Sequence, residues 1–193
     1  MAVTPHSSKK VDELIRRLDQ ATAARDDAAR CRNVKQVLVD VVASGEQFLD
    51  PPFLEPAPER YARRLVYRAP EDRYTVLAMV WDVGQGTPLH DHAGTWCVEC
   101  VYRGKIKVSS FSAHGGDPEK DIVRFEPESV IMAGVGEAGA LIPPFEYHMI
   151  ENPTDRPAVT IHVYGGEMTF CHVYEPVGGG GYRRTYRELT YTA

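Results

Sequence analysis

The sequence predicts a mainly β protein, an antiparallel β-barrel with a small helical cap at its N-terminal end. Two observations predict this class. The first fifty residues carry apolar side chains at helical spacing, and after Tyr61 short segments rich in Val, Ile, Tyr and Thr alternate with Gly, Pro, Asp or Asn. Because no helical pattern interrupts these later segments, an antiparallel sandwich or barrel is favoured over a parallel sheet.

The first fifty residues predict two helices. Their spacing is carried by Val11, Leu14, Ile15 and Leu18 in the first helix and by Val34, Val37, Leu38, Val41 and Val42 in the second. The polar stretch DQATAARDDAARCRN between them holds the turn. Gly45 is typical of a helix stop, and the prolines of residues 50–59 prevent a helix from continuing.

Five segments after Tyr61 predict strands, namely 74–83, 105–111, 121–127, 158–166 and 169–176. The glycine run in 178–184 predicts a turn or bulge near the end of the chain. A chain of 193 residues fits one domain. We therefore expect a single domain over 1–193, with the helical cap at about 1–50 and the β-barrel at 61–193.

Composition narrows the classes of partner. The formal charge of -5 shows no basic excess, so we expect no nucleic-acid partner. No apolar run is long enough to span a bilayer, and the start MAVTPHSSKKVDELI lacks the apolar core of a signal peptide. Four irregularly spaced cysteines do not make a disulfide scaffold. We expect a cytoplasmic monomer without a membrane partner.

Two histidines one residue apart indicate a metal site. On an extended strand His90 and His92 share one face, with Cα atoms roughly 6.5 Å apart. His148 follows a Pro-Pro turn on another strand-like segment, and a barrel brings such a distant strand to the same metal. Each motif alone is also compatible with an ordinary hydrogen-bonded histidine.

Together the motifs resemble those of the cupin superfamily, whose fold is a β-barrel of the jelly-roll type. The matching residues are Gly84, His90, His92 and Gly104 in the first motif and Pro143, His148 and Asn152 in the second. Phe145 departs from the second motif because it stands where cupins have glycine.

A second departure concerns the cupin glutamate three or four residues beyond the second histidine. Trp96 and Cys97 occupy those positions, and we interpret Glu99, two residues further on, as a solvated or barrel-wall side chain. Three neutral imidazoles keep the full charge of a divalent ion and leave a face open. An anionic ligand such as a substrate thiolate would supply the missing charge.

From about Tyr61 to Tyr174 the sequence resembles the cysteine dioxygenase family, cupin iron enzymes that add both atoms of O2 to a thiol to give a sulfinate. The resemblance implies an Fe(II) cofactor on His90, His92 and His148, with L-cysteine as substrate. It further implies a thioether crosslink between Cys97 and Tyr164, a catalytic role for these two residues with His162, and substrate binding by Arg63 and Tyr61.

The residues themselves agree with these roles. The planar guanidinium of Arg63 can hold a carboxylate through two hydrogen bonds. His162 and Tyr164 share one face of a strand, so the imidazole can orient the phenol. Without the other motifs, a packed barrel tyrosine beside a satisfied histidine explains this pair equally well.

Three alternatives remain at this point. Cys97 and Cys100 form a Cys-x-x-Cys motif, but on the strand expected over 96–102 they face opposite ways and cannot readily pair. A dioxygenase for another small thiol carboxylate, such as 3-mercaptopropionate, fits the same motifs. So does a cupin that binds metal without turnover, although such a protein needs no Tyr164, His162 and Arg63. The sequence leaves open the preference among thiols and the extent of the crosslink.

Overall fold

The computed structural model describes residues 9–144 and 146–192, so the departure at Phe145 lies outside the described residues. Two α-helices form the expected N-terminal cap, α1 (Lys9–Thr22) and α2 (Asp27–Ala43). Asp26 begins α2, because its carboxylate accepts the backbone N–H of Ala29 at 2.8 Å. The helix ends before Gly45, whose φ of +70° is unstrained only for a residue without a Cβ.

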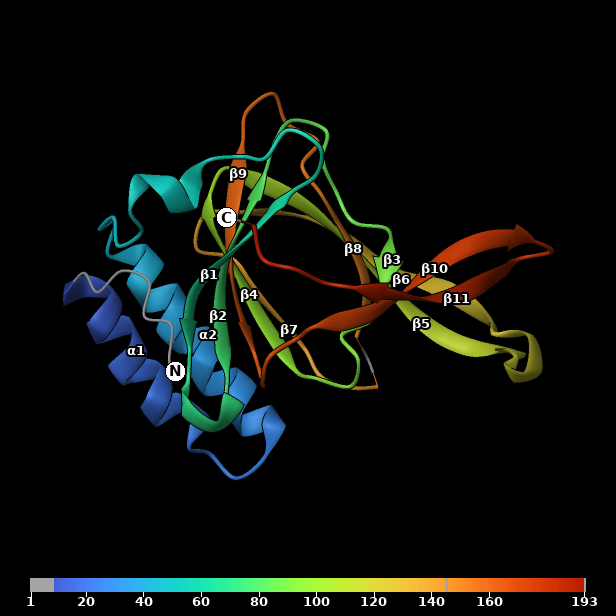
Figure 1. Cartoon of the computed structure of the whole chain (residues 1–193), viewed down its shortest axis with the longest axis horizontal. Helices are drawn as coiled ribbons and strands as arrows, with labels where there is room; N and C mark the ends of the chain where they lie inside the picture. Colours follow the sequence, from blue (N-terminus) through green and yellow to red (C-terminus); the bar gives the residue numbers. More distant parts are fainter. Residues whose placement is uncertain (1–8, 145, 193) are drawn as a thin grey trace.

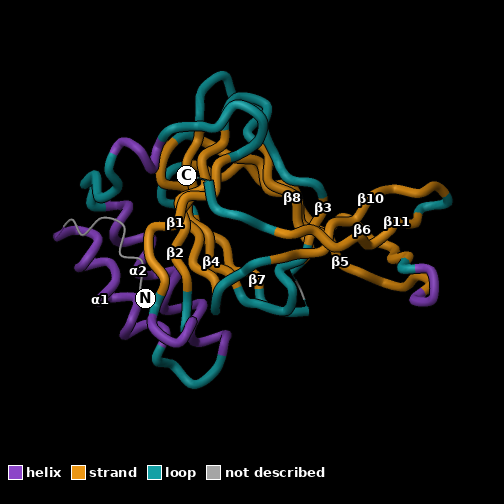
Figure 2. The backbone as a smooth tube through the Cα atoms, viewed as in Figure 1, coloured by secondary structure: helices purple, strands orange, loops and turns teal. Residues whose placement is uncertain are grey.

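The remaining elements of the described chain are mainly strands, which confirms the predicted class. They are β1 (Ala62–Arg68), β2 (Thr75–Trp81), β3 (Leu89–His90), β4 (Cys97–Arg103), β5 (Lys105–Asp117), β6 (Ile122–Gly134), β7 (Ala138–Leu141), β8 (Tyr147–Glu151), β9 (Ala158–Tyr164), β10 (Phe170–Gly178) and β11 (Gly181–Glu188). Short 3₁₀ turns lie at Pro51–Leu54, Pro70–Asp72 and Pro118–Lys120. Figure 2 shows that strands make up most of the backbone beyond the helices.

The strands pair antiparallel throughout the described residues and form two sheets. One has five strands in the order β1-β2-β9-β4-β7, and the other closes as β10-β11-β6-β5-β8-β3. In Figure 1 both helices lie against the outer side of the five-stranded sheet, away from the second sheet. The barrel interior therefore lies between the inner face of the first sheet and the strands of the second.

Strand β4 shows how one segment serves both faces of the five-stranded sheet. Val98 and Cys100 pack in the hydrophobic cluster that includes the helices, whereas Cys97 and Val101 pack in the cluster inside the barrel. Cys97 and Cys100 thus face opposite ways, as the alternation of side chains along a strand predicts. This arrangement excludes a disulfide bond between Cys97 and Cys100.

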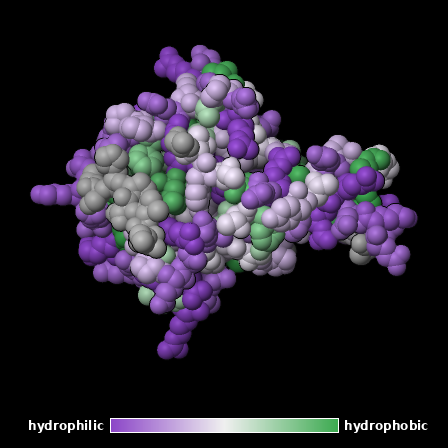
Figure 3. All heavy atoms as spheres, in the orientation of Figure 1, coloured by the Kyte–Doolittle hydropathy of each residue, from purple (hydrophilic) through white to green (hydrophobic). Residues whose placement is uncertain are grey.

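Two long hairpins, β5–β6 and β10–β11, extend beyond the barrel (Figure 1). Figure 3 shows that the visible surface of this projection is largely hydrophilic, with a few hydrophobic side chains. The turn between β10 and β11 lies at the predicted glycine run, where Pro176 and Gly178 also mark an irregularity in the strand register. None of the helices in the described part of the chain is long and apolar enough to cross a membrane.

Candidate metal centre

The three predicted histidines lie together inside the barrel. His90 on β3 pairs directly with His148 on β8, so the two imidazoles come from adjacent strands. His92 lies just beyond the end of β3, which stops at His90 and does not continue through both histidines as expected. The candidate ligand atoms of His90, His92 and His148 are all within 4.8 Å of one another.

The surroundings of these imidazoles fit a bound metal ion. The Nδ1 atom of His90 donates to the carbonyl of Pro88 at 3.1 Å, which leaves Nε2 available as a ligand. In the described structure, Nδ1 of His92 and both ring nitrogens of His148 are buried without a hydrogen-bond partner. Burial lowers the pKa of His92 and His148 well below the ordinary value, so both are in the neutral form that ligates metals.

Asp91 holds the segment between the two histidines, a role that no motif in the sequence indicates. Its carboxylate accepts the backbone N–H of Ala93 at 3.0 Å and the backbone N–H of His172 at 2.9 Å. It also contacts Nδ1 of His172 at 3.0 Å and accepts the Tyr174 hydroxyl at 2.8 Å. These bonds fix the backbone on both sides of His92 and thereby position its imidazole.

The other predicted catalytic residues lie on adjacent strands of the five-stranded sheet. Cys97 on β4 pairs with Tyr164 on β9, and Glu99 pairs with His162. Directly opposed residues of antiparallel strands have Cβ atoms about 4.5–5.5 Å apart, close enough for a thioether after a small adjustment. Cys97, Tyr164 and His162 are all buried.

A chain of hydrogen bonds orients His162 and Tyr164. Trp81 donates its Nε1–H to the Thr160 hydroxyl at 2.9 Å, and that hydroxyl is 2.8 Å from Nε2 of His162. This pattern favours a hydroxyl proton donated to Nε2 and a ring proton on Nδ1. Nδ1 of His162 is 3.2 Å from the Tyr164 oxygen, and the Tyr164 hydroxyl donates to the sulfur of Met79 at 3.7 Å.

The thiol and the phenol of this group stay protonated. Burial, followed by the nearby Glu99 carboxylate, raises the pKa of Cys97 well above its ordinary value. Burial likewise raises the pKa of Tyr164, with a smaller contribution from Cys97. A buried neutral thiol is a poor nucleophile, which further disfavours dithiol exchange at Cys97.

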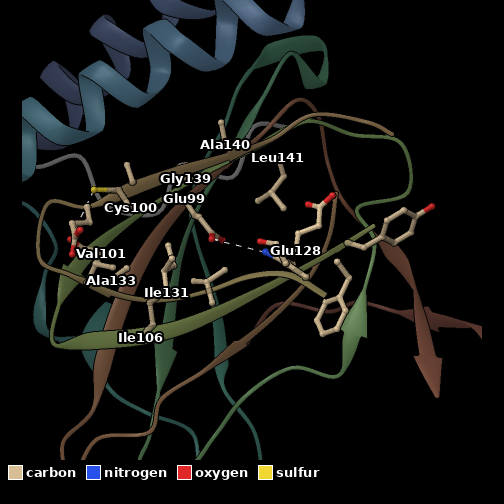
Figure 4. A pocket seen from close by; sticks show the side chains of 17 residues that line it. Glu99, Cys100, Val101, Ile106, Glu128, Ile131, Ala133, Gly139, Ala140 and Leu141 are labelled. Carbon is tan, nitrogen blue, oxygen red and sulfur yellow. Dashed lines mark hydrogen bonds and ion pairs between the residues drawn. The ribbon is translucent and has the colours of Figure 1, made fainter. Parts of the chain in front are cut away.

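Of the two interpretations of Glu99 from the sequence, a solvated or a barrel-wall side chain, the structure excludes the solvated one, because the residue is buried on β4. The side chain points to the interior, with one carboxylate oxygen 4.0 Å from Nδ1 of His148 and the other 3.7 Å from Nδ1 of His162. Burial raises its pKa to about 7. Glu99 lines a cavity of about 310 Å³, and Figure 4 shows its side chain among the other residues of this cavity. The alternation of side chains along β4, counted from Cys97, is the signal that places Glu99 on the inner face.

Arg63 and Tyr61 lie at a separate cavity on another side of the histidines. A small inner cavity of about 20 Å³ is lined by both residues together with His90 and Tyr164, and it adjoins a larger cavity of about 290 Å³. Arg63 is 6% exposed, and its guanidinium donates to the carbonyls of Met168 at 3.3 Å and Thr190 at 3.4 Å. Tyr61 stacks on Trp81 with ring centroids 4.7 Å apart.

Comparison with known proteins assigns the chain to a family. A model of the family described as cysteine dioxygenase type I matches residues 8–176. The chain belongs to that family. As a member of the cysteine dioxygenase type I family, it is 24% identical over 117 residues to cysteine dioxygenase type 1 of Homo sapiens and 22% identical over 118 residues to that of Danio rerio. Each alignment covers 60% of this chain and 56% of the relative, so the match spans little more than half the length of these relatives.

Solved structures similar to this family member include a Thermus thermophilus protein, with a TM-score of 0.47, 20% identity and coverage of 63% of this chain and 98% of the other. A Klebsiella pneumoniae protein with a double-stranded β-helix domain gives a TM-score of 0.46 and 16% identity, over 72% of this chain and 97% of the other. These distant similarities do not indicate an activity.

Proposed function

We propose that the protein is an Fe(II)-dependent thiol dioxygenase that converts L-cysteine and O2 to cysteine sulfinic acid. The observation that carries the proposal is Arg63, a buried guanidinium for which no acidic partner is found in the described part of the chain. It lines the same inner cavity as His90 and Tyr164. A buried charge needs a counter-charge, and a substrate carboxylate would supply it within reach of the histidines.

The metal would be held by His90, His92 and His148. When bound, iron(II) supplies a redox-active cation beside which thiolate and dioxygen can react. The three imidazoles are neutral ligands, so the substrate thiolate would be the anionic ligand of the metal. The thiol supplies all four electrons that reduce O2, and both oxygen atoms stay in the sulfinate, so no external reductant is required.

The protein side chains position the substrate. Arg63 binds the carboxylate, and Tyr61 forms the neighbouring wall through its stacking on Trp81. His162 orients the phenol of Tyr164. The hydroxyl of Tyr164 would donate a hydrogen bond to O2 or to the substrate carboxylate. A Cys97–Tyr164 thioether would fix the phenol. Forming this bond removes two hydrogen atoms, one from sulfur and one from the ring, and O2 would be the oxidant.

A related thiol carboxylate is the second candidate substrate. The residues that line the inner cavity include Arg63 and Arg187 but no Asp or Glu, so none of its described residues offers a carboxylate to a substrate ammonium group. This lining suits an amine-free thiol such as 3-mercaptopropionate as well. Cysteine is preferred because its amine would give the metal a second ligand atom beside the thiolate.

We further propose that the protein is a monomer and that it is located in the cytoplasm. All four cysteines are free and buried, which suits a reducing compartment.

Oxygen uptake by the iron-loaded protein tests this function. We expect stoichiometric O2 consumption and sulfinate formation with L-cysteine, and slower turnover with 3-mercaptopropionate. Faster turnover of the amine-free thiol would reverse the substrate assignment. If neither thiol is consumed although iron is bound, the dioxygenase function is wrong and the alternative of a non-catalytic metal-binding protein stands.

A further inference from the structure

Glu99 is a buried carboxylate that the proposed reaction does not use. Only 5% of the residue is exposed, and its Oε2 atom has no hydrogen-bond partner in the described structure. Burying a carboxylate without a partner is costly, so a hydrogen-bond donor that approaches Glu99 would offset this cost. The nitrogen atoms that face it belong to His148, at 4.0 Å, and to His162, at 3.7 Å.

His148 also lacks hydrogen-bond partners, because both of its ring nitrogens are buried without one in the described structure. A metal-bound histidine uses one nitrogen as ligand and normally donates the N–H of the other to a carboxylate or a carbonyl. His90 already follows this pattern, with Nδ1 bonded to the carbonyl of Pro88. A metal on Nε2 and Glu99 at Nδ1 would account for both nitrogens of His148.

We propose that Glu99 is a positioning residue of the metal centre, accepting the Nδ1 proton of His148 and placing a negative charge beside three neutral ligands. This inference rests on the metal site of the proposed function. The present distance is about 1 Å longer than a hydrogen bond. Glu99, His148 and Leu141 line the cavity of about 310 Å³ in Figure 4, which leaves the carboxylate room to move closer.

The role has two consequences for a bound metal. Carboxylates hydrogen-bonded to ligating histidines typically contribute about 10- to 100-fold to metal affinity, because they fix the ring and raise its basicity. The same negative charge stabilises Fe(III) relative to Fe(II), so it lowers the reduction potential of the bound iron. Neither consequence follows if Glu99 only fills space in the barrel wall.

The variant Glu99→Gln tests the inference, because it keeps the shape of the side chain and removes the charge. Fe(II) affinity is measured anaerobically by competition with a chelator, and the reduction potential of the bound iron by redox titration. We expect affinity to fall by about 10- to 100-fold and the potential to rise. Glu99→Asp, which keeps the charge, should restore part of both. Glu128→Gln is the matched control, since Glu128 lines the same cavity but is exposed.

Thermal unfolding of the metal-free variants separates this role from a structural one. Without metal the Glu99 carboxylate has no compensation, so Glu99→Gln should unfold at the same temperature as the parent protein or higher. Loss of stability in the metal-free protein, or an unchanged affinity and potential, would overturn the inference. If the parent protein binds no Fe(II), the proposed function fails as well. If it binds Fe(II) and oxidises thiols while Glu99→Gln behaves identically, only the role of Glu99 is wrong.

Discussion

At the level of single residues, the proposed substrate site depends on Arg63, which lines the inner cavity. Its guanidinium is held by two backbone carbonyls and faces no described acidic side chain. We expect Arg63→Gln to lower kcat/KM for L-cysteine by about 10- to 100-fold, since hydrogen bonds between charged groups contribute about 1.5–3 kcal/mol. Steady-state oxygen uptake measures the effect.

The neighbouring arginine provides the control for this substitution. Arg64 lies on the opposite face of β1 and donates to the carbonyl of Glu55 at 2.9 Å, outside the barrel interior. Arg64→Gln should therefore leave kcat/KM close to the parent value. Equal losses in the two variants would mean that Arg63 acts through stability and does not bind the carboxylate.

Cys97 and Tyr164 support a second prediction. Because they are paired directly across β4 and β9, oxidation by O2 should join them and remove two hydrogen atoms from the mass of the chain. In Cys97→Ser this mass loss should disappear while Fe(II) binding is retained. A freed phenol regains about 1 kcal/mol of side-chain entropy, so we expect kcat to fall about fivefold. Peptide mass spectrometry would contradict the pairing if it located the crosslink elsewhere.

Single positions also show the limit of sequence reasoning about the site. The three histidines are predictable because their residue type is itself a metal-binding signal, and the structure brings them together. Glu99 could be interpreted from the sequence only as a solvated or barrel-wall side chain, and the solvated option, which follows the usual exposure of glutamate, is wrong. Alternation along β4 places Glu99 on the same inner face as Cys97, and the register of β4 against β9 brings it opposite His162. Asp91 carries no comparable signal, because its partners come from β10, far along the sequence.

At the level of elements, the contact between β4 and β9 depends on a glycine just beyond β9. Gly165 donates its N–H to the carbonyl of Trp96 at 3.0 Å, and a Cβ at this position would lie 2.2 Å from the Trp96 indole nitrogen. We expect Gly165→Ala to reduce the free energy of unfolding by about 1–3 kcal/mol through overpacking. Displacement of Trp96 also moves its neighbour Cys97, so the crosslink yield should fall.

Chemical denaturation and mass spectrometry measure these two effects. Gly134→Ala is the control, because a Cβ there meets only Glu137 at 3.5 Å, an ordinary contact distance. It should change stability by less than about 0.5 kcal/mol. Full stability and full crosslinking in Gly165→Ala would show that Trp96 can move without affecting β4.

Strand positions are predictable where hydrophobic pattern decides them. The expected strands at 74–83 and 158–166 correspond to β2 and β9, which are buried along their whole length. The strands expected at 105–111 and 121–127 are longer in the structure, because β5 continues through Gly115 and Gly116 with a shift in register. Glycines in a sequence indicate a turn and a bulge equally well. The sequence does not predict β7, because its four residues are too few to show a period.

At the level of the whole molecule, the two sheets contribute different residues to the candidate site. The second sheet, which closes as β10-β11-β6-β5-β8-β3, supplies His90 and His148 from β3 and β8. The five-stranded sheet supplies Arg63, Cys97, His162 and Tyr164 from its inner face, and its outer face is covered by the helices. Candidate residues for metal binding and for substrate binding therefore come from different sheets and meet in the barrel interior.

From the proposed metal site we expect the stability of the molecule to depend on metal. An ion that binds the folded chain at a concentration about 100 times its Kd stabilises it by about 2.7 kcal/mol, which raises the Tm of a chain of this size by about 5–10 °C. We expect this rise on anaerobic addition of Fe(II), and its reversal by a chelator, in scanning calorimetry. His148→Ala should abolish the rise, because it removes one of the three candidate ligands of the site. The same rise in His148→Ala would place the metal elsewhere in the chain.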